Sequence, residues 1–163
     1  MDFDYEYIFK ELNSEGIDYV VVGGLAVNLH GIPRMTYDLD LMIRLDRENV
    51  AKTVNKLRSL GYFPRAPVSA EDLADEEVRE TWIREKNMKA FSFYSPDQPI
   101  GEIDLMIDLP LAYDVIKERA LIFEIGSTKV PVISLRDLIE IKKISNRKQD
   151  LSDVEHLRKL LEK

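Results

Sequence analysis

The tetrapeptide Asp-Leu-Met-Ile occurs twice in the sequence, at positions 40–43 and 104–107, and each copy continues an alternation of polar and apolar residues. Because successive side chains of a β-strand point to opposite faces, both segments predict strands with one apolar face and an aspartate on the other. Two strands with the same one-sided pattern suit adjacent positions in one sheet. That pairing would place Asp104 next to Asp40, and near Asp38 on the same face.

A glycine pair precedes the first of these strands. An apolar run at 19–22 ends at Gly23 and Gly24 and passes into a helix-compatible segment at 25–29. Glycines at a strand-to-helix turn let a phosphate approach the backbone, and the positive end of a helix favours an anion. A glycine pair also occurs in ordinary tight connections that bind nothing, so this feature alone leaves both interpretations open.

The strand at 36–43 carries the strongest chemical signal, because Asp38 and Asp40 leave the same face. Two neighbouring carboxylates repel each other unless a cation lies between them. Next to a phosphate-binding turn, this pair suggests Mg²⁺, or Mn²⁺, and a nucleotide. The competing interpretation, which also covers Asp104, is the exposed polar face of an edge hairpin.

Basic side chains occur at two places that suit a phosphate. Arg34 lies shortly before the aspartate strand, where it would pair with phosphate, hold the aspartates, or be a solvated loop cation. A second group at 142–148 includes Lys142 and Arg147 in an otherwise acidic protein. This group would balance a triphosphate, or its later members would complement the dipole of a helix end.

Composition narrows the functional classes. The 163 residues predict one domain, and a net charge of −7 argues against a broad, nonspecific nucleic-acid binder. The absence of cysteine excludes disulfides and thiolate metal sites, and two histidines leave little for zinc. The acidic N-terminal segment lacks the basic and apolar regions of a signal peptide, and no apolar run approaches ~18 residues. We therefore expect a cytoplasmic protein without membrane contact.

The remaining pattern is a series of short elements. Trp82 is a candidate base-stacking residue or, as we favour, a residue packed on the sheet, and His30 is interpreted as structural or as shaping the site. We expect helices at 4–15, 47–60, 69–87, 111–120, 135–145 and 151–161 and further strands at 89–95, 101–108, 122–125 and 130–133.

The order of glycine pair, short helix and Asp-x-Asp strand resembles the nucleotidyltransferase superfamily with the DNA polymerase β-like fold. The segment GGLAVNLHGIPRMTYDLDL, which includes Arg34 and Thr36, is similar to a small prokaryotic branch that contains the nucleotidyltransferase toxins of type IV toxin/antitoxin systems. The closing segment resembles the same branch through its characteristic order of Lys142, Arg147, Asp150 and Asp153.

The resemblance implies a single α/β (α+β) domain over 1–163, with a small mixed β-sheet, helices packed on one face and a C-terminal helical part at 134–163. It implies transfer of a nucleoside monophosphate from an NTP to a hydroxyl, with release of pyrophosphate. Asp38, Asp40 and Asp104 would be catalytic and bind the metal. The expected nucleotide-binding residues are Gly23, Gly24, Arg34, Thr36, Lys142 and Arg147.

The resemblance leaves the physiological partners open. Transfer RNA, a protein or a small molecule would each serve as acceptor, and an antitoxin-type protein would be a binding partner. A noncatalytic nucleotide- or partner-binding module that retains the fold is the alternative function. The expected mark of such a module is a lost carboxylate, and all three carboxylates are present.

Overall fold

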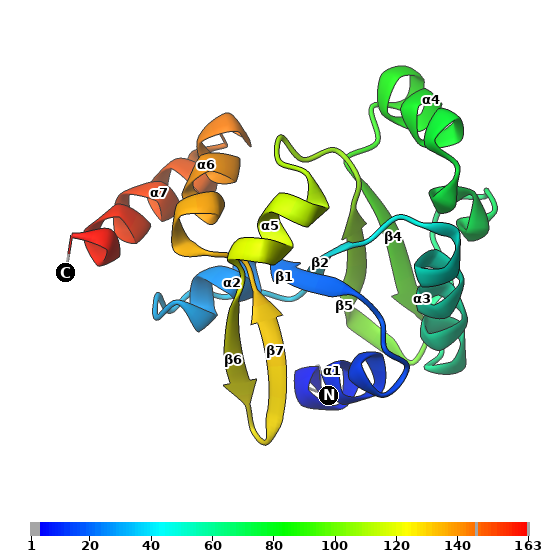
Figure 1. Ribbon diagram of the computed structural model, residues 1–163, viewed down its shortest axis with the longest axis horizontal. Coiled ribbons are helices and arrows are strands. Elements are labelled where there is room, and N and C mark those ends of the chain that lie inside the picture. The colour runs from blue at the N-terminus through cyan, green and yellow to red at the C-terminus, as the bar shows by residue number, and fades with distance from the viewer. Residues whose placement is uncertain (1–3, 146, 163) are drawn as a thin grey trace.

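A computed structural model describes residues 4–145 and 147–162 as a sheet with helices around it (Figure 1). The sheet has seven strands in the order β3-β4-β5-β2-β1-β7-β6. The strands are β1 (Tyr19–Val22), β2 (Leu39–Ile43), β3 (Phe63–Pro64), β4 (Ala90–Ser95), β5 (Gln98–Met106), β6 (Leu121–Ile125) and β7 (Thr128–Val132). The helices are α1 (Tyr5–Ser14), α2 (Gly23–Leu29), α3 (Arg47–Ser59), the 3₁₀ turn η1 (Ala70–Ala74), α4 (Glu76–Lys86), α5 (Tyr113–Arg119), α6 (Leu135–Ser145) and α7 (Lys148–Leu161).

Strand directions are mixed, as the sequence predicts. The central strand β2 pairs antiparallel with β1 and parallel with β5. β1 also pairs parallel with β7, whereas β4 with β5 and β6 with β7 form antiparallel hairpins. Parallel neighbours need a long connection. The chain between β2 and β5 supplies it with α3, η1, α4 and the strands β3 and β4.

The two faces of the sheet differ in burial. Along β4, buried and half-buried residues alternate strictly, so that Phe91 and Phe93 are buried while Ser92 and Tyr94 are half-buried. The buried face meets helices, and Trp82 of α4 packs on Phe91 with ring centroids 5.5 Å apart. Burial of each such apolar side chain contributes about 1.5–3 kcal/mol. The interpretation of Trp82 as a packing residue is therefore confirmed.

Several predicted elements differ from the structure in their bounds, three of them as follows. β2 begins at Leu39 rather than at residue 36, because the carboxylate of Asp38 accepts the backbone N–H of Glu102 at 2.9 Å and replaces a backbone ladder bond. The helix predicted at 69–87 is interrupted at Asp75, whose side chain caps α4 by accepting from the N–H of Val78. α7 begins at Lys148, three residues earlier than predicted.

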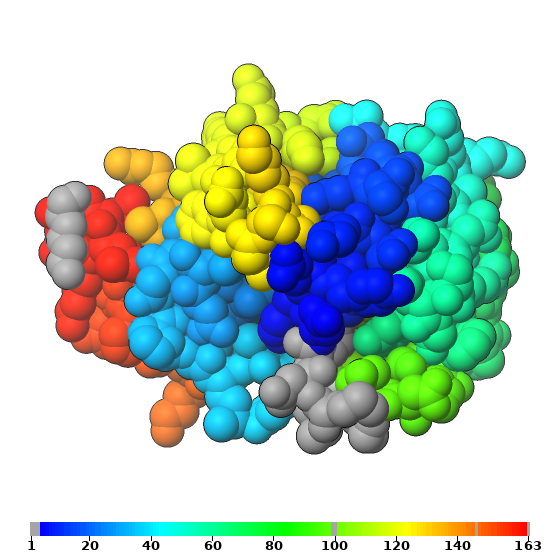
Figure 2. All heavy atoms as spheres, turned by 90° about the horizontal axis from the view of Figure 1, so that it is seen from below, coloured from blue at the N-terminus to red at the C-terminus, as the bar shows by residue number. Residues whose placement is uncertain are grey.

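The C-terminal helices form a pair at one end of the molecule, with α6 and α7 side by side (Figure 1). Viewed from below, α7 lies at one end and α1 near the centre of the face (Figure 2). Val154 and Leu157 of α7 are buried, whereas Leu151 and Leu161 are exposed. Among the described residues, no helix combines the length and the apolar character that crossing a membrane requires.

Candidate active site

Asp40 and Asp104 lie directly opposite each other on the neighbouring parallel strands β2 and β5. The predicted juxtaposition of the two repeated segments is thereby confirmed. Asp38 flanks the pair from the segment before β2, with one carboxylate oxygen held by the N–H of Glu102. The half-open face of the sheet thus presents two carboxylates from adjacent strands and a third from the segment before β2.

The surroundings of the pair disfavour two negative charges. Burial, together with the nearby charges of Asp104 and Asp38, raises the pKa of Asp40 to about 7. Burial also raises the pKa of Asp104, although a hydrogen bond from Ser92 acts in the opposite direction. A protein that keeps both groups ionised at neutral pH needs a cation nearby.

These residues fit a divalent metal ion by their chemistry. Oδ1 of Asp104 is buried and has no hydrogen-bond partner among the described residues, so an acceptor oxygen is left for a cation. Carboxylate oxygens are the ligands that Mg²⁺ prefers. Within the described part of the chain, however, no three such side chains already converge as a formed metal cluster. The site is therefore a carboxylate pair with Asp38 beside it.

The glycine turn is shaped by the carboxylates next to it. Gly23 begins α2 with a φ of +68°, and a Cβ at this position would lie 2.8 Å from Cβ of Asp40 and closer still to its Oδ2. A Cβ on Gly24 would lie 2.9 Å from Oγ1 of Thr36. Glycine is thus required at both positions, because Asp40 of β2 lies too close to Gly23, and Thr36 of the segment before β2 lies too close to Gly24, for either to carry a side chain. Their predicted contact with phosphate stays a prediction.

A cavity of about 560 Å³ opens beside Asp40 and Gly23, between the end of β5 and the C-terminal helices. Its polar lining includes Lys142 and Arg147, two of the predicted nucleotide ligands. Its apolar wall consists of Met106, Leu109, Pro110, Leu138, Ile141 and Ile144. A cavity with an apolar wall and a few charged groups is typical of a small-ligand site.

The predicted basic residues are joined by two buried aspartates. Nζ of Lys142 lies 3.2 Å from Oδ1 of Asp150 and 3.0 Å from Oδ2 of Asp153, and all three side chains are almost fully buried. Arg34 forms an ion pair with Asp153, and Nε of Arg147 lies 2.7 Å from Oδ2 of Asp150. Arg34 is therefore not a solvated loop cation. Its contact with phosphate, like that of Lys142 and Arg147, stays a prediction.

Asp150 lies inside α7, and Arg147 is the N-cap residue of this helix. Burial alone would raise the pKa of Asp150, but hydrogen bonds from Arg147, Ser145 and Lys142 outweigh it and lower the pKa to about 2. Asp150 is therefore a permanently charged acceptor that ties the start of α7 to α6.

His30 has a structural role, as one of its two interpretations predicts, and the predicted contact of Thr36 with the nucleotide stays a prediction. Nε2 of His30 lies 2.8 Å from the carbonyl oxygen of Ile133, and its ring packs edge-on against Phe123. Thr36 faces Gly24 from the segment before β2. Sequence reasoning missed the cluster of Phe63, Tyr94 and Arg65 on the same open face, since β3 has only two residues and no periodic signal.

Comparison with solved structures shows which class of fold this is. A structure of lincosamide antibiotic adenylyltransferase LnuA bound to lincomycin matches with a TM-score of 0.63 and 15% identity over 98% of both chains. ANT(2'')-Ia in complex with adenylyl-2''-tobramycin matches with a TM-score of 0.57 and 12% identity, over 96% of this chain and 86% of that chain. A putative nucleotidyltransferase from Thermotoga maritima matches with a TM-score of 0.52 and 18% identity, over 96% of this chain and 89% of that chain.

The chain therefore has the nucleotidyltransferase fold, with a mixed sheet as the sequence predicts. No protein-family model matches the chain, and a comparison with curated proteins gives no match either. At identities of 11–19% the shared property is the fold. The chemistry has to be argued from the residues of this chain.

Proposed function

We propose that the protein transfers a nucleoside monophosphate from a nucleoside triphosphate to a hydroxyl group and releases pyrophosphate. The observation that carries this proposal is the pairing of Asp40 with Asp104 across β2 and β5, next to the turn at Gly23. The nucleotidyltransferase fold supports it, because structures as different as LnuA and ANT(2'')-Ia share the same arrangement of elements.

Each group has a distinct task in the proposed reaction. Asp38, Asp40 and Asp104 would hold Mg²⁺, which when bound neutralises phosphate charge and lowers the pKa of the acceptor hydroxyl. The cavity beside Asp40 would hold the triphosphate, with Lys142 and Arg147 as its cations. The acceptor oxygen bonds to the α-phosphorus, the bond to the β-phosphate oxygen breaks, and the hydroxyl proton passes to Asp104.

Ligand-induced stabilisation tests the donor half of this reaction without an acceptor. We would measure the melting temperature with each of four NTPs, with and without Mg²⁺, in the wild type and in Asp40→Asn. A ligand at a hundredfold excess over its Kd stabilises the native state by about 2.7 kcal/mol. We expect a Mg²⁺-dependent rise with at least one NTP that Asp40→Asn abolishes.

The matched control is Asp72→Asn, because Asp72 is an exposed carboxylate on η1. This variant should keep the full response to Mg²⁺ and NTP. A wild-type protein that shows no shift with any NTP at millimolar concentration would contradict the proposal and favour a noncatalytic module. A shift that survives Asp40→Asn would place the nucleotide away from the carboxylate pair.

A further inference from the structure

The open face of the sheet carries an aromatic and cationic cluster beside the carboxylates. Phe63 of β3 is opposite Tyr94 of β4, and the two ring centroids are 6.5 Å apart. The guanidinium carbon of Arg65 lies 5.0 Å from the Tyr94 ring centroid, in a cation–π contact, and Arg65 also pairs with Glu102 of β5. Phe63 is 42% exposed and the Arg65 side chain is 58% exposed, so a ligand can reach both.

This cluster is aligned with the carboxylates by the register of the sheet. The N–H of Arg65 donates to the carbonyl of Ser92, and Ser92 is opposite Asp104, which in turn is opposite Asp40. One row of residues therefore runs from Arg65, directly after β3, across β4 and β5 to Asp40 of β2. Adjacent strands are roughly 4.8 Å apart, so Ser92 and its neighbours on β4 lie about 10 Å from β2.

The cluster and the cavity lie on different sides of the carboxylate pair. The cavity continues from Asp40 toward Met106 at the end of β5, away from Glu102. The cluster lies in the other direction, over β3, β4 and the earlier part of β5 around Glu102. A donor in the cavity and an acceptor on the cluster would therefore approach Asp104 from opposite directions.

The charges near the cluster do not suit a polycation. Glu102, the carboxylate that the cluster contacts directly, is paired with Arg65. This carboxylate is therefore already compensated. What the surface offers instead is two aromatic rings and a planar guanidinium, which are the groups on which nucleobases stack.

We propose that Phe63, Tyr94 and Arg65 form an acceptor platform that binds a nucleobase and directs a sugar hydroxyl of the same nucleoside toward Asp104. The inference rests on the proposed function and names the acceptor class for that site: a nucleoside or a nucleotide end. The base stacks on Tyr94 and Phe63, and Arg65 stacks on it or meets its phosphate. The residues of the platform bind and orient the acceptor and do not touch the donor.

Binding of nucleoside probes tests the platform. Titrations with AMP and with a fluorescently labelled hexamer of adenylate, (rA)₆, would be carried out on the wild type, Tyr94→Leu, Arg65→Gln and Arg65→Lys. We expect the aromatic variant to weaken binding about tenfold or more. Arg65→Gln should also weaken binding, and Arg65→Lys should not restore it, because lysine keeps the charge and loses the planar group.

Two controls separate this inference from the proposed function. Ile122→Ser changes an exposed residue of β6, at the opposite edge of the sheet, and should bind the probes as the wild type does. The Mg²⁺-dependent shift with NTP should be unchanged in all platform variants, which also verifies that they fold. If the wild type gives that shift but binds neither probe, the platform inference is wrong while the proposed function stands.

The probes also distinguish the sources of the base. Binding of AMP and (rA)₆ with similar affinity indicates a free nucleotide acceptor, and stronger binding of (rA)₆ indicates a nucleic-acid end; both support the platform. Tobramycin serves as the polycation probe. If the wild type bound tobramycin but neither nucleotide probe, and if Tyr94→Leu lost the binding of tobramycin, the assignment of a nucleobase would be overturned.

Discussion

Gly23 and Gly16 have nearly the same backbone conformation, with φ of +68° and +67°, yet their surroundings are opposite. Space around Gly16 is open, whereas a side chain on Gly23 would collide with Asp40. The pair therefore separates two effects of a glycine substitution. One is the strain of a left-handed backbone, and the other is displacement of a carboxylate that the proposed reaction needs.

Gly16→Ala should cost only the strain, about 1–2 kcal/mol in the free energy of unfolding. Gly23→Ala should cost more than Gly16→Ala and should also abolish the Mg²⁺-dependent shift with NTP, since Asp40 has to move. Urea denaturation and the NTP melting assay would measure both effects. Equal costs in the two variants, with the NTP response intact in both, would show that the contact with Asp40 has no importance.

The carboxylate pair was predictable from the sequence, because a period of two assigns each residue of a strand to a face, and two segments shared the same pattern. The cluster of Phe63, Tyr94 and Arg65 was not. Phe63 comes from a two-residue strand, Arg65 directly follows that strand, and Tyr94 comes from a strand whose half-open face carries mixed side chains. Only the register between β3 and β4 brings them together, and register is a property of the folded sheet.

The pairing of α6 with α7 contains a buried ionic centre, formed by Lys142 with Asp150 and Asp153. Removal of one partner from a buried ion pair leaves uncompensated charge in a medium of low polarity. Arg34 joins the same centre from the segment before β2, so the helices are also tied to the site. The stability of the α6–α7 pair therefore depends on Lys142, a residue that the family resemblance assigns to phosphate.

Lys142→Met should destabilise the protein by about 3–5 kcal/mol, because two buried carboxylates lose their cation. The neighbouring Lys143 is a matched control, since it is 40% exposed and makes only a surface pair with Glu140. Lys143→Met should change the free energy of unfolding by less than about 1 kcal/mol. Similar small effects in both variants, measured by urea denaturation, would contradict a structural role for Lys142.

At the level of elements, long amphipathic segments were predictable and their ends were not. α6 has the predicted bounds, whereas β2 is shorter and the predicted helix at 69–87 is two elements. In both cases an aspartate side chain decides the outcome, by taking a backbone N–H that a regular element would have used. That competition between side chain and backbone does not change the spacing of apolar residues along the sequence. The spacing therefore could not predict where these elements end.

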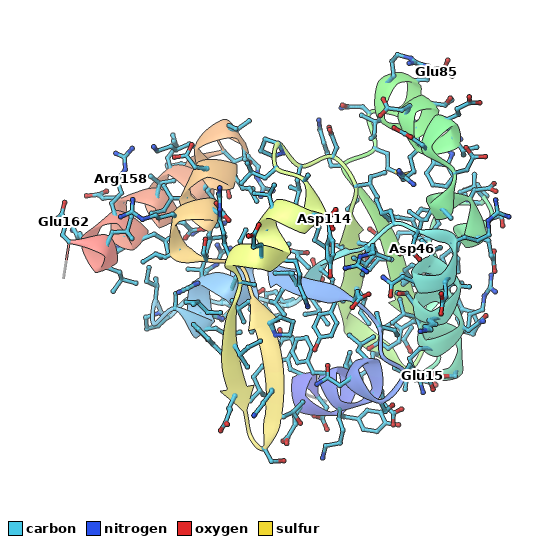
Figure 3. All side chains as sticks on the ribbon, in the orientation of Figure 1. Glu15, Asp46, Glu85, Asp114, Arg158 and Glu162 are labelled. Carbon is cyan, nitrogen blue, oxygen red and sulfur yellow. The ribbon has the colours of Figure 1, made fainter. Side chains whose placement is uncertain are left out.

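For the molecule as a whole, negative charge is spread over the surface as well as concentrated at the site. Exposed acidic residues such as Glu85, Asp114 and Glu162 lie on separate elements around the outside (Figure 3). The overall charge of −7 therefore repels nucleic acid in general. A nucleoside or nucleotide acceptor would therefore have to be held by a local surface. The platform of Phe63, Tyr94 and Arg65 is such a surface.

Stability of the metal-free protein should depend on pH through Asp40. Its pKa in the folded state is about 7, above the ordinary value of 3.8, so the folded state retains a proton that the unfolded chain loses. The resulting stabilisation is complete below about pH 4 and disappears as the pH rises through 7. Asp40→Asn should reduce this slope to the part that Asp104 contributes, and should stabilise the protein at pH 8 by about 1–2 kcal/mol.

Urea denaturation in the presence of a chelator, at intervals between pH 4.5 and 8.5, would measure the dependence. Asp72→Asn again serves as the control and should leave the slope unchanged. A wild-type stability that is flat over this range, or that rises with pH to the same extent in both proteins, would mean that Asp40 is ionised in the metal-free fold.

The parallel pairing of β2 with β5 also has a consequence for the order in which the molecule is made. Residues 40 and 104 belong to one pair, but everything in between, including both strands at that edge, is synthesised before the second aspartate leaves the ribosome. Closing so long a loop is a late event in folding. The growing chain therefore carries Asp38 and Asp40 without Asp104 while residues 41–104 are made, and it acquires the carboxylate pair only when β5 inserts between β4 and β2.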